Sequence, residues 1–360
     1  MPKRLHQLCL LAALLPLAIL LFQWITGRVD QAFWPTLSFL SLLIIGFYGF
    51  ESLKGFVFPL CIFIGITLSL YYPGYFITVG PLKLTNLIIP LIQLIMFGMG
   101  TLMSLKDFGA VFTQPRGVII GVTAQLGIMP LVGYGLAKLS GFDPEIAAGI
   151  VLIGCSPSGV ASNVMAYLAK ANVALSITIT TIATLLAPVV TPLLMKVLAG
   201  EFVALDTLAM MWSIVKMILL PIGAGLVFNY LFRSHIHRLN TILPVFSMTS
   251  IAIIIVVITA AGRDSLIEIG GILILLVLIH NLFGYVLGYW YGKLFGMAER
   301  DARTIAIEVG MQNGGLASGI ANSLGKIATM GLAPAIFGPL MNITGSLLAS
   351  YWSRNTPQEQ

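Results

Sequence analysis

The chain has 360 residues, of which 58% are hydrophobic and only 9% are charged. Soluble domains carry roughly 25% charged residues, so this composition excludes an ordinary water-soluble protein and indicates a membrane protein. The net charge of +6 is explained by basic loop residues against anionic lipid, and it requires no nucleic-acid partner.

Apolar stretches of about 17 to 25 residues predict membrane-spanning helices. The first stretch follows Lys3 and Arg4 as a signal peptide would, but no small-residue cleavage site closes it, so we expect it to be retained. The sequence therefore predicts an all-α polytopic membrane protein with about 12 transmembrane segments. In chain order these are 7–26, 34–51, 55–72, 86–105, 117–139, 145–169, 173–197, 207–232, 241–261, 266–294, 302–325 and 329–352.

The basic residues predict the orientation of these segments, because short cytoplasmic loops are enriched in Lys and Arg. With the N-terminus inside, 12 of the 19 basic residues fall on the cytoplasmic side and 6 on the other. We therefore expect a multi-pass protein of a bacterial-type inner (plasma) membrane, with both termini in the cytoplasm.

Two of the predicted spans contain residues that interrupt a helix. Span 145–169 holds the run Gly154–Gly159, and in span 302–325 a glycine-rich run, Gly310–Gly315, follows Glu308. A carboxylate at membrane depth is costly unless it faces a cavity or an ion, and irregular backbone at that depth lines such a cavity. We therefore interpret the chain as a membrane transporter.

The interruptions fall at equivalent places in two halves of the chain, which start at residues 55 and 207. The starts lie 152 residues apart and the breaks, taken at Pro157 and Gly310, lie 153 apart. Each half has five spans, and an odd number gives the second half the opposite orientation. Paired interruptions in inverted repeats mark a transporter's binding site. The pattern predicts two inverted five-helix repeats, preceded by an accessory N-terminal helix pair in 1–53.

The residues around the breaks offer oxygen ligands. An unwound helix frees backbone carbonyls and amides, and Pro157 has no N–H to donate. Ser176 and Thr180 are four residues apart and share a helix face. A hard monovalent cation, sodium, fits an oxygen set with one negative charge better than a transition metal does. The set comprises Gln125, Ser162, Asn163, Ser176, Thr180, Glu308 and Gln312.

The remaining conspicuous residues predict structural roles. Three cysteines show no metal-ligand spacing, and we expect no disulfide framework or zinc site. His280, alone in its span, is expected to be packed and hydrogen-bonded. Gly284, Gly288 and Gly292 recur every fourth residue and predict a close-packed helix face.

Several stretches together resemble the signature regions of the bile acid:sodium symporter family. They are Phe97–Gly100, Gln125–Pro130, Gly154–Asn163, Tyr167–Lys170 and Glu308–Asn313. The resemblance runs from about residue 55 to the C-terminus, and the first signature departs from the common Pro-Gly-Gly in having Pro157-Ser158-Gly159. It implies a panel domain (55–105 with 207–261), a core domain with two crossed, discontinuous helices (117–197 with 266–352) and a cytoplasmic tail (353–360).

The resemblance also implies two sodium sites and no organic cofactor. The first site would use Ser162, Asn163, Ser176, Thr180 and Glu308. The second would use Gln125, Glu308, Gln312 and the backbone carbonyls of Val309 and Met311.

Members of the family move organic anions such as bile acids, pantoate or 2-keto acids. Helix N-termini at the crossed breaks would present partial positive charge to a carboxylate. The candidate contacts are the residues Ser158, Gly159, Val160, Ala161, Asn313 and Asn342. The expected partners are this small anion and the lipid bilayer, with no obligate protein partner.

Other functions remain open at this point. An intramembrane hydrolase could use Ser156 or Cys155, but neither has an evident base within the membrane, so we expect no enzyme. A channel fits the mixed Glu, Gln and Asn set less well than a carrier does. Within carriers, protons titrating on Glu308 could replace sodium, or the cargo could be an oxyanion such as arsenite, exported with the help of Cys155.

Overall fold

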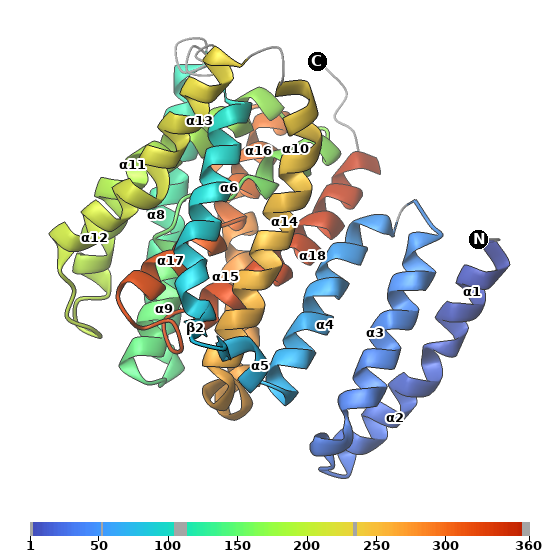
Figure 1. The fold of residues 1–360 in the computed structure, drawn as a ribbon. Coiled ribbons are helices and arrows are strands. Elements are labelled where there is room, and N and C mark those ends of the chain that lie inside the picture. Colours follow the sequence, from blue (N-terminus) through green and yellow to red (C-terminus); the bar gives the residue numbers. More distant parts are fainter. Residues whose placement is uncertain (1–2, 52, 104–113, 233–235, 355–360) are drawn as a thin grey trace.

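The computed structural model describes residues 3–51, 53–103, 114–232 and 236–354. Within these ranges the regular secondary structure is helical, apart from one short hairpin of β1 (Thr78–Val79) and β2 (Leu82–Lys83). The long helices stand side by side, with α1 to α3 along one edge of the molecule (Figure 1). The predicted loop around Lys106 and residues 355–360 of the predicted tail lie outside the described residues.

The N-terminal part forms the edge of the bundle. It consists of α1 (Lys3–Ala12), α2 (Leu14–Ile25) and α3 (Phe33–Tyr48), and α3 packs against α4 (Val57–Tyr71). The predicted span 7–26 is thus two helices, because Pro16 has no N–H for the Ala12 carbonyl and its ring clashes with that carbonyl.

The segments predicted to form the panel pack on one another. They are α4, α5 (Gly74–Ile77), α6 (Ile88–Leu102), α12 (Thr207–Ile214), α13 (Leu220–Leu231) and α14 (Ile236–Ala261). A π-helical turn, Val215–Leu219, joins α12 to α13 next to Pro221, which cannot donate a helical hydrogen bond. A Cβ at Gly100 would lie 2.3 Å from the Ile222 carbonyl, so α6 and α13 approach each other because this residue is glycine. The division into panel and core stays a prediction.

The segments predicted to form the core contain both interrupted spans. They are α8 (Pro115–Ser140), α9 (Pro144–Gly154), α10 (Ala161–Leu168), α11 (Val173–Leu198), α15 (Arg263–Leu294), α16 (Glu299–Gly310), α17 (Gly314–Ser323) and α18 (Leu332–Arg354). Span 145–169 is therefore the pair α9 and α10, and span 302–325 is the pair α16 and α17.

Outside the core, 3₁₀ turns lie at Val29–Gln31, Lys54–Phe56 and Leu84–Leu87.

Eight helices among the described residues are long and apolar enough to cross a membrane. Three shorter apolar helices, Phe33–Tyr48, Pro144–Gly154 and Val245–Ala261, accompany them. The protein is thus an all-α polytopic membrane protein, while the count of about 12 segments and the inverted repeat stay predictions. Three of the 12 predicted segments, 7–26, 145–169 and 302–325, each consist of two helices, and the sequence predicted the interruption in the last two of them.

The predicted glycine stripe packs α15 tightly against α16. A Cβ at Gly288 would lie 2.9 Å from the Val309 Cβ, and one at Gly292 would lie 3.1 Å from the Ala302 Cα. The close approach fixes α16, which carries Glu308, to the longest helix among the described residues. The predicted close-packed face is confirmed.

Polar contacts hold the start of α16. Glu299 Oε2 accepts a hydrogen bond from the Tyr289 hydroxyl (2.9 Å) and pairs with Lys293 Nζ (2.8 Å), and Oε1 accepts one from Arg303 Nε (2.9 Å). Burial alone would raise the pKa of Glu299, but these partners outweigh it and lower the pKa to about 2. Arg303 also lies over the Trp352 ring, 5.4 Å from its centroid, which ties the end of α18 to this turn.

Candidate ion site at the crossing of two interrupted helices

The two helix interruptions cross and bond to each other. Gly159 N donates to the Met311 carbonyl at 2.9 Å, and Asn313 N donates to the Pro157 carbonyl at 2.8 Å. Ser158 and Gln312 thereby form an isolated antiparallel bridge. Four half-helices, α9, α10, α16 and α17, consequently end or begin at one buried place.

Local chemistry explains why the chain unwinds here. Pro157 has no N–H to continue α9, and it disfavours a helical backbone at Ser156. A Cβ at Gly159 would lie 2.9 Å from the Gln312 carbonyl oxygen, so only glycine permits this approach. On the opposite segment, Asn313 Oδ1 accepts from Leu316 N at 3.0 Å and caps the start of α17.

Glu308 lies at the centre of the first predicted ligand set. Its side chain is fully buried. Oε1 accepts hydrogen bonds from the Ser162 and Ser176 hydroxyls at 2.6 and 2.5 Å, and Oε2 accepts one from the Thr180 hydroxyl at 2.7 Å. Asn163 Oδ1 lies 2.8 Å from the Ser176 hydroxyl. The structure therefore brings together all five residues of this set, from α10, α11 and α16.

Hydroxyl, amide and carboxylate oxygens converge in this cluster. The Ser176 hydroxyl carries one proton, yet it lies within hydrogen-bond distance of both Glu308 and Asn163. The Thr180 hydroxyl is shared in the same way, at 2.7 Å from Glu308 Oε2 and 3.3 Å from Asn163 Oδ1. Since a serine or threonine hydroxyl donates a single hydrogen bond, neither hydroxyl can donate to both of its neighbouring oxygens at once. A bound cation would satisfy them.

The second predicted set surrounds two glutamines. Gln125 Nε2 donates to Gln312 Oε1 at 2.7 Å and to the Ser156 carbonyl at 3.1 Å, and Gln312 Nε2 donates to the Val309 carbonyl at 2.6 Å. Gln125 Oε1 is buried and has no hydrogen-bond partner among the described residues. An orphaned buried acceptor is costly, so this oxygen fits a cation ligand. The hydrogen bonds of Glu308, in contrast, go to the hydroxyls of the first set.

The predicted anion contacts take different positions. Ser158 is buried, with its hydroxyl 3.5 Å from that of Thr180, whereas Val160 is 37% exposed at the start of α10. The Asn313 side chain caps α17. Asn342 Nδ2 donates to the Gly338 carbonyl of its own helix at 3.0 Å. The side-chain amides of Asn313 and Asn342 are thus already engaged.

Asn281, which the sequence did not single out, supports the crossing from α15. Its Nδ2 donates to the Gly310 carbonyl, at the end of α16, at 2.8 Å. Its Oδ1 accepts a hydrogen bond of 2.6 Å from the Thr344 hydroxyl of α18. A polar amide within the apolar run of α15 is the signal that could have identified it. His280 Nε2 lies 2.9 Å from the Met129 carbonyl, as the packed role predicts.

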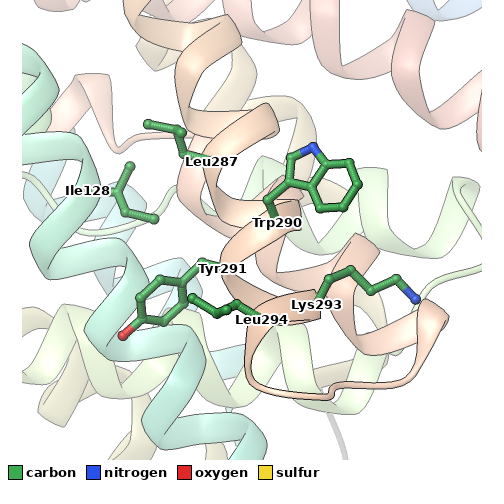
Figure 2. A pocket seen from close by; sticks show the side chains of 6 residues that line it. All are labelled: Ile128, Leu287, Trp290, Tyr291, Lys293 and Leu294. Atoms are coloured by element: carbon green, nitrogen blue, oxygen red, sulfur yellow. The ribbon is translucent and has the colours of Figure 1, made fainter.

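A separate groove of about 600 Å³ lies between α8 and α15. Figure 2 shows its walls, which are almost entirely apolar. They are formed by Ile128, Leu287, Trp290, Tyr291, Lys293 and Leu294. None of these residues belongs to the two oxygen sets, so the groove is distinct from the crossing.

Interrupted helices that meet around buried polar groups within a helical membrane protein are the architecture of secondary transporters. A profile of the Sodium Bile acid symporter family matches residues 89–269. The chain belongs to this family, as the signature motifs predict, and it is a multi-pass membrane transporter.

Curated relatives agree with this assignment. The chain is 42% identical over 268 residues to the "Uncharacterized sodium-dependent transporter YocS" of Bacillus subtilis (strain 168), covering 74% of this chain and 83% of that protein. It is 31% identical over 302 residues to the "Probable sodium/metabolite cotransporter BASS1, chloroplastic" of Arabidopsis thaliana, covering 84% and 74%. It is also 31% identical over 296 residues to a probable sodium/metabolite cotransporter, BASS2, of Oryza sativa subsp. japonica, covering 82% and 70%.

Proposed function

We propose that the protein is a secondary active transporter that couples sodium entry to symport of a small organic anion by alternating access. The observation that carries the proposal is the convergence of hydroxyl, amide and carboxylate oxygens of five residues around fully buried Glu308. The relatives named as sodium-dependent or sodium/metabolite transporters support the same ion. The protein would work in the inner (plasma) membrane, with both termini in the cytoplasm.

The first sodium ion would bind among Ser162, Asn163, Ser176, Thr180 and Glu308. Hydroxyl, amide and carboxylate oxygens are the ligands of hard cations, and Glu308 supplies one negative charge for one sodium charge. A proton would satisfy only a single acceptor, and several oxygens converge here. This difference favours sodium over a proton as the coupling ion.

A second ion would bind near the orphaned Gln125 Oε1. Gln312 and the Val309 and Met311 carbonyls would complete its ligands. The Val309 carbonyl already accepts from Gln312, and the Met311 carbonyl from Gly159, but each carbonyl has a second lone pair. Since this set has no carboxylate of its own beyond Glu308, we expect weaker binding of sodium here than at the first site.

The anion would bind at the half-helix N-termini beside the ions. The amides of Val160 and Ala161 open α10, and Val160 reaches the molecular surface. The partial positive charge of a helix start, with the bound sodium ions, favours a carboxylate. The proposed substrate class is a bile acid, pantoate or 2-keto acid. Sodium and anion should tighten each other's binding by the same factor, as linkage requires.

Two alternatives predict different results. A proton-coupled carrier would protonate Glu308, and its transport would follow the pH gradient in sodium-free buffer. An arsenite-type exporter would need thiol ligands, but Cys155 is buried and no group of three metal-binding side chains occurs among the described residues. Export of an arsenite-type oxyanion with the help of Cys155 therefore has less support than sodium-coupled symport.

The direct test is uptake of labelled organic anions into proteoliposomes under an inward sodium gradient. The proposal predicts accumulation with sodium and none with potassium. Glu308→Ala should abolish the sodium-dependent part, while the matched control Glu268→Ala, at an exposed carboxylate of α15, should retain it. Equal uptake in sodium and potassium, or undiminished sodium stimulation in Glu308→Ala, would contradict the proposal.

A further inference from the structure

We propose that Asn172 and Thr304 form a register lock between α11 and α16, which positions the first sodium site without touching the ion. This inference rests on the proposed sodium site. The Thr304 hydroxyl accepts from Asn172 N at 2.8 Å and lies 3.1 Å from the Asn172 carbonyl, and Thr304 is fully buried. One side chain of α16 thus bonds the backbone at the start of α11.

The lock lies one helical turn before the ion ligands on both helices. Ser176 follows Asn172 by four residues, and Glu308 follows Thr304 by four residues. Residues four apart lie on the same helix face, about 6 Å further along the axis. The Ser176 hydroxyl meets Glu308 Oε1 at 2.5 Å at this next level. The Asn172–Thr304 and Ser176–Glu308 contacts are thus successive interactions between the same pair of helices, one helical turn apart.

The Asn172 side chain holds the same two helices a second time. Its Oδ1 accepts from Leu175 N at 3.1 Å and caps α11, and its Nδ2 donates to Asp301 Oδ1 of α16 at 2.8 Å. Nδ2 also lies 3.2 Å from Gln114 Oε1, just before α8. The cap of the helix that carries Ser176 is thereby fastened to the half-helix that carries Glu308.

The geometry predicts a larger effect on the first ion than on the second. α16 ends at Gly310, so a slide of this half-helix against α11 would lengthen the contacts of Glu308 with Ser176 and Thr180. Gln125 and Gln312 bond each other directly, and α11 supplies no predicted ligand of the second ion. The lock should therefore control the affinity of the first sodium ion and leave the maximal transport rate at saturating sodium intact.

The test compares Thr304→Val, which keeps the shape and loses the hydroxyl, with Thr304→Ser, which keeps the hydroxyl. Sodium dependence of anion uptake is measured in proteoliposomes. Loss of a buried hydrogen bond predicts that Thr304→Val raises the half-saturating sodium concentration about five- to tenfold, with a maximal rate close to that of the parent. Thr304→Ser should stay within about twofold of the parent, by the same relation.

A second variant covers the case in which Thr304→Val does not fold. Asp301→Ala removes only the side-chain contact of Asn172, near the surface, and should raise the half-saturating sodium concentration about threefold, as expected for a weaker, partly exposed hydrogen bond. An unchanged sodium affinity in a folded Thr304→Val, or in Asp301→Ala if that is the only folded variant, would overturn the lock. So would a Thr304→Ser as impaired as Thr304→Val. A parent protein without sodium dependence would instead contradict the proposed function.

Discussion

Replacing Glu308 by Gln removes the negative charge from the crossing and nearly preserves the shape of the side chain. In the parent, the carboxylate accepts hydrogen bonds of 2.5 to 2.7 Å from Ser162, Ser176 and Thr180. An amide nitrogen cannot accept such bonds, and it cannot ligate a cation. The variant should therefore lose sodium binding at the first site.

The size of the loss follows from the burial of Glu308. Removing one partner of a buried ion pair costs about 3–5 kcal/mol, which is more than a hundredfold in affinity. At a sodium concentration 100 times the Kd, the parent gains about 2.7 kcal/mol of stability. With a Kd raised a hundredfold, the same concentration gives the variant a gain of only about 0.4 kcal/mol. Without sodium, Glu308→Gln should be the more stable of the two proteins, because the parent then buries an unbalanced charge.

The assay is thermal unfolding of the purified protein in detergent, in sodium chloride and in choline chloride of equal ionic strength. The parent should unfold at a higher temperature in sodium, and Glu308→Gln should unfold at nearly the same temperature in both salts. Glu268→Gln, at an exposed position of α15, serves as the control and should behave as the parent does. A sodium-induced rise of equal size in Glu308→Gln would show that sodium binding does not depend on the Glu308 carboxylate.

Three further predictions concern the support of the site. Gly159→Ala places a Cβ 2.9 Å from the Gln312 carbonyl and should lower stability by about 1–3 kcal/mol in thermal unfolding; an unchanged melting temperature would show that the crossing widens freely. Asn281→Ala leaves the Gly310 carbonyl without its side-chain donor and should cost about 1–3 kcal/mol in the same assay, a result that a neutral Asn281→Ala would contradict. Glu299, with its pKa lowered from 4.5 to about 2, stabilises the fold above pH 4.5 and loses that contribution as the pH falls toward 2. The stability difference between the parent and Glu299→Gln should accordingly shrink below pH 4.5 in pH-dependent unfolding, and a constant difference would argue against these ion pairs.

The sequence predicted the features that have a local cause. Pro157 and the glycines after Glu308 interrupt their own helices, so both breaks could be located without knowledge of the fold. Ser176 and Thr180 share a helix face because of their spacing, and the structure places both against Glu308. Their convergence with residues of α10 follows from the crossing of the two breaks, for which the family resemblance supplied the expectation.

The remaining features depend on contacts that local patterns do not encode. Asn172 and Thr304 lie 132 positions apart in the sequence. Taken alone, Asn172 is an ordinary helix cap and Thr304 is an ordinary buried hydroxyl. The kink before α2 was missed because the apolar period continues through Pro16.

The most direct test of the central claim is an experimental structure of the protein in saturating sodium, at a resolution that shows ion coordination. We expect an ion at the crossing, bound by Glu308 and by oxygens of Ser162, Asn163, Ser176 and Thr180. A cluster at saturating sodium that keeps only its hydroxyl-to-carboxylate hydrogen bonds, with no ion among these oxygens, would contradict it.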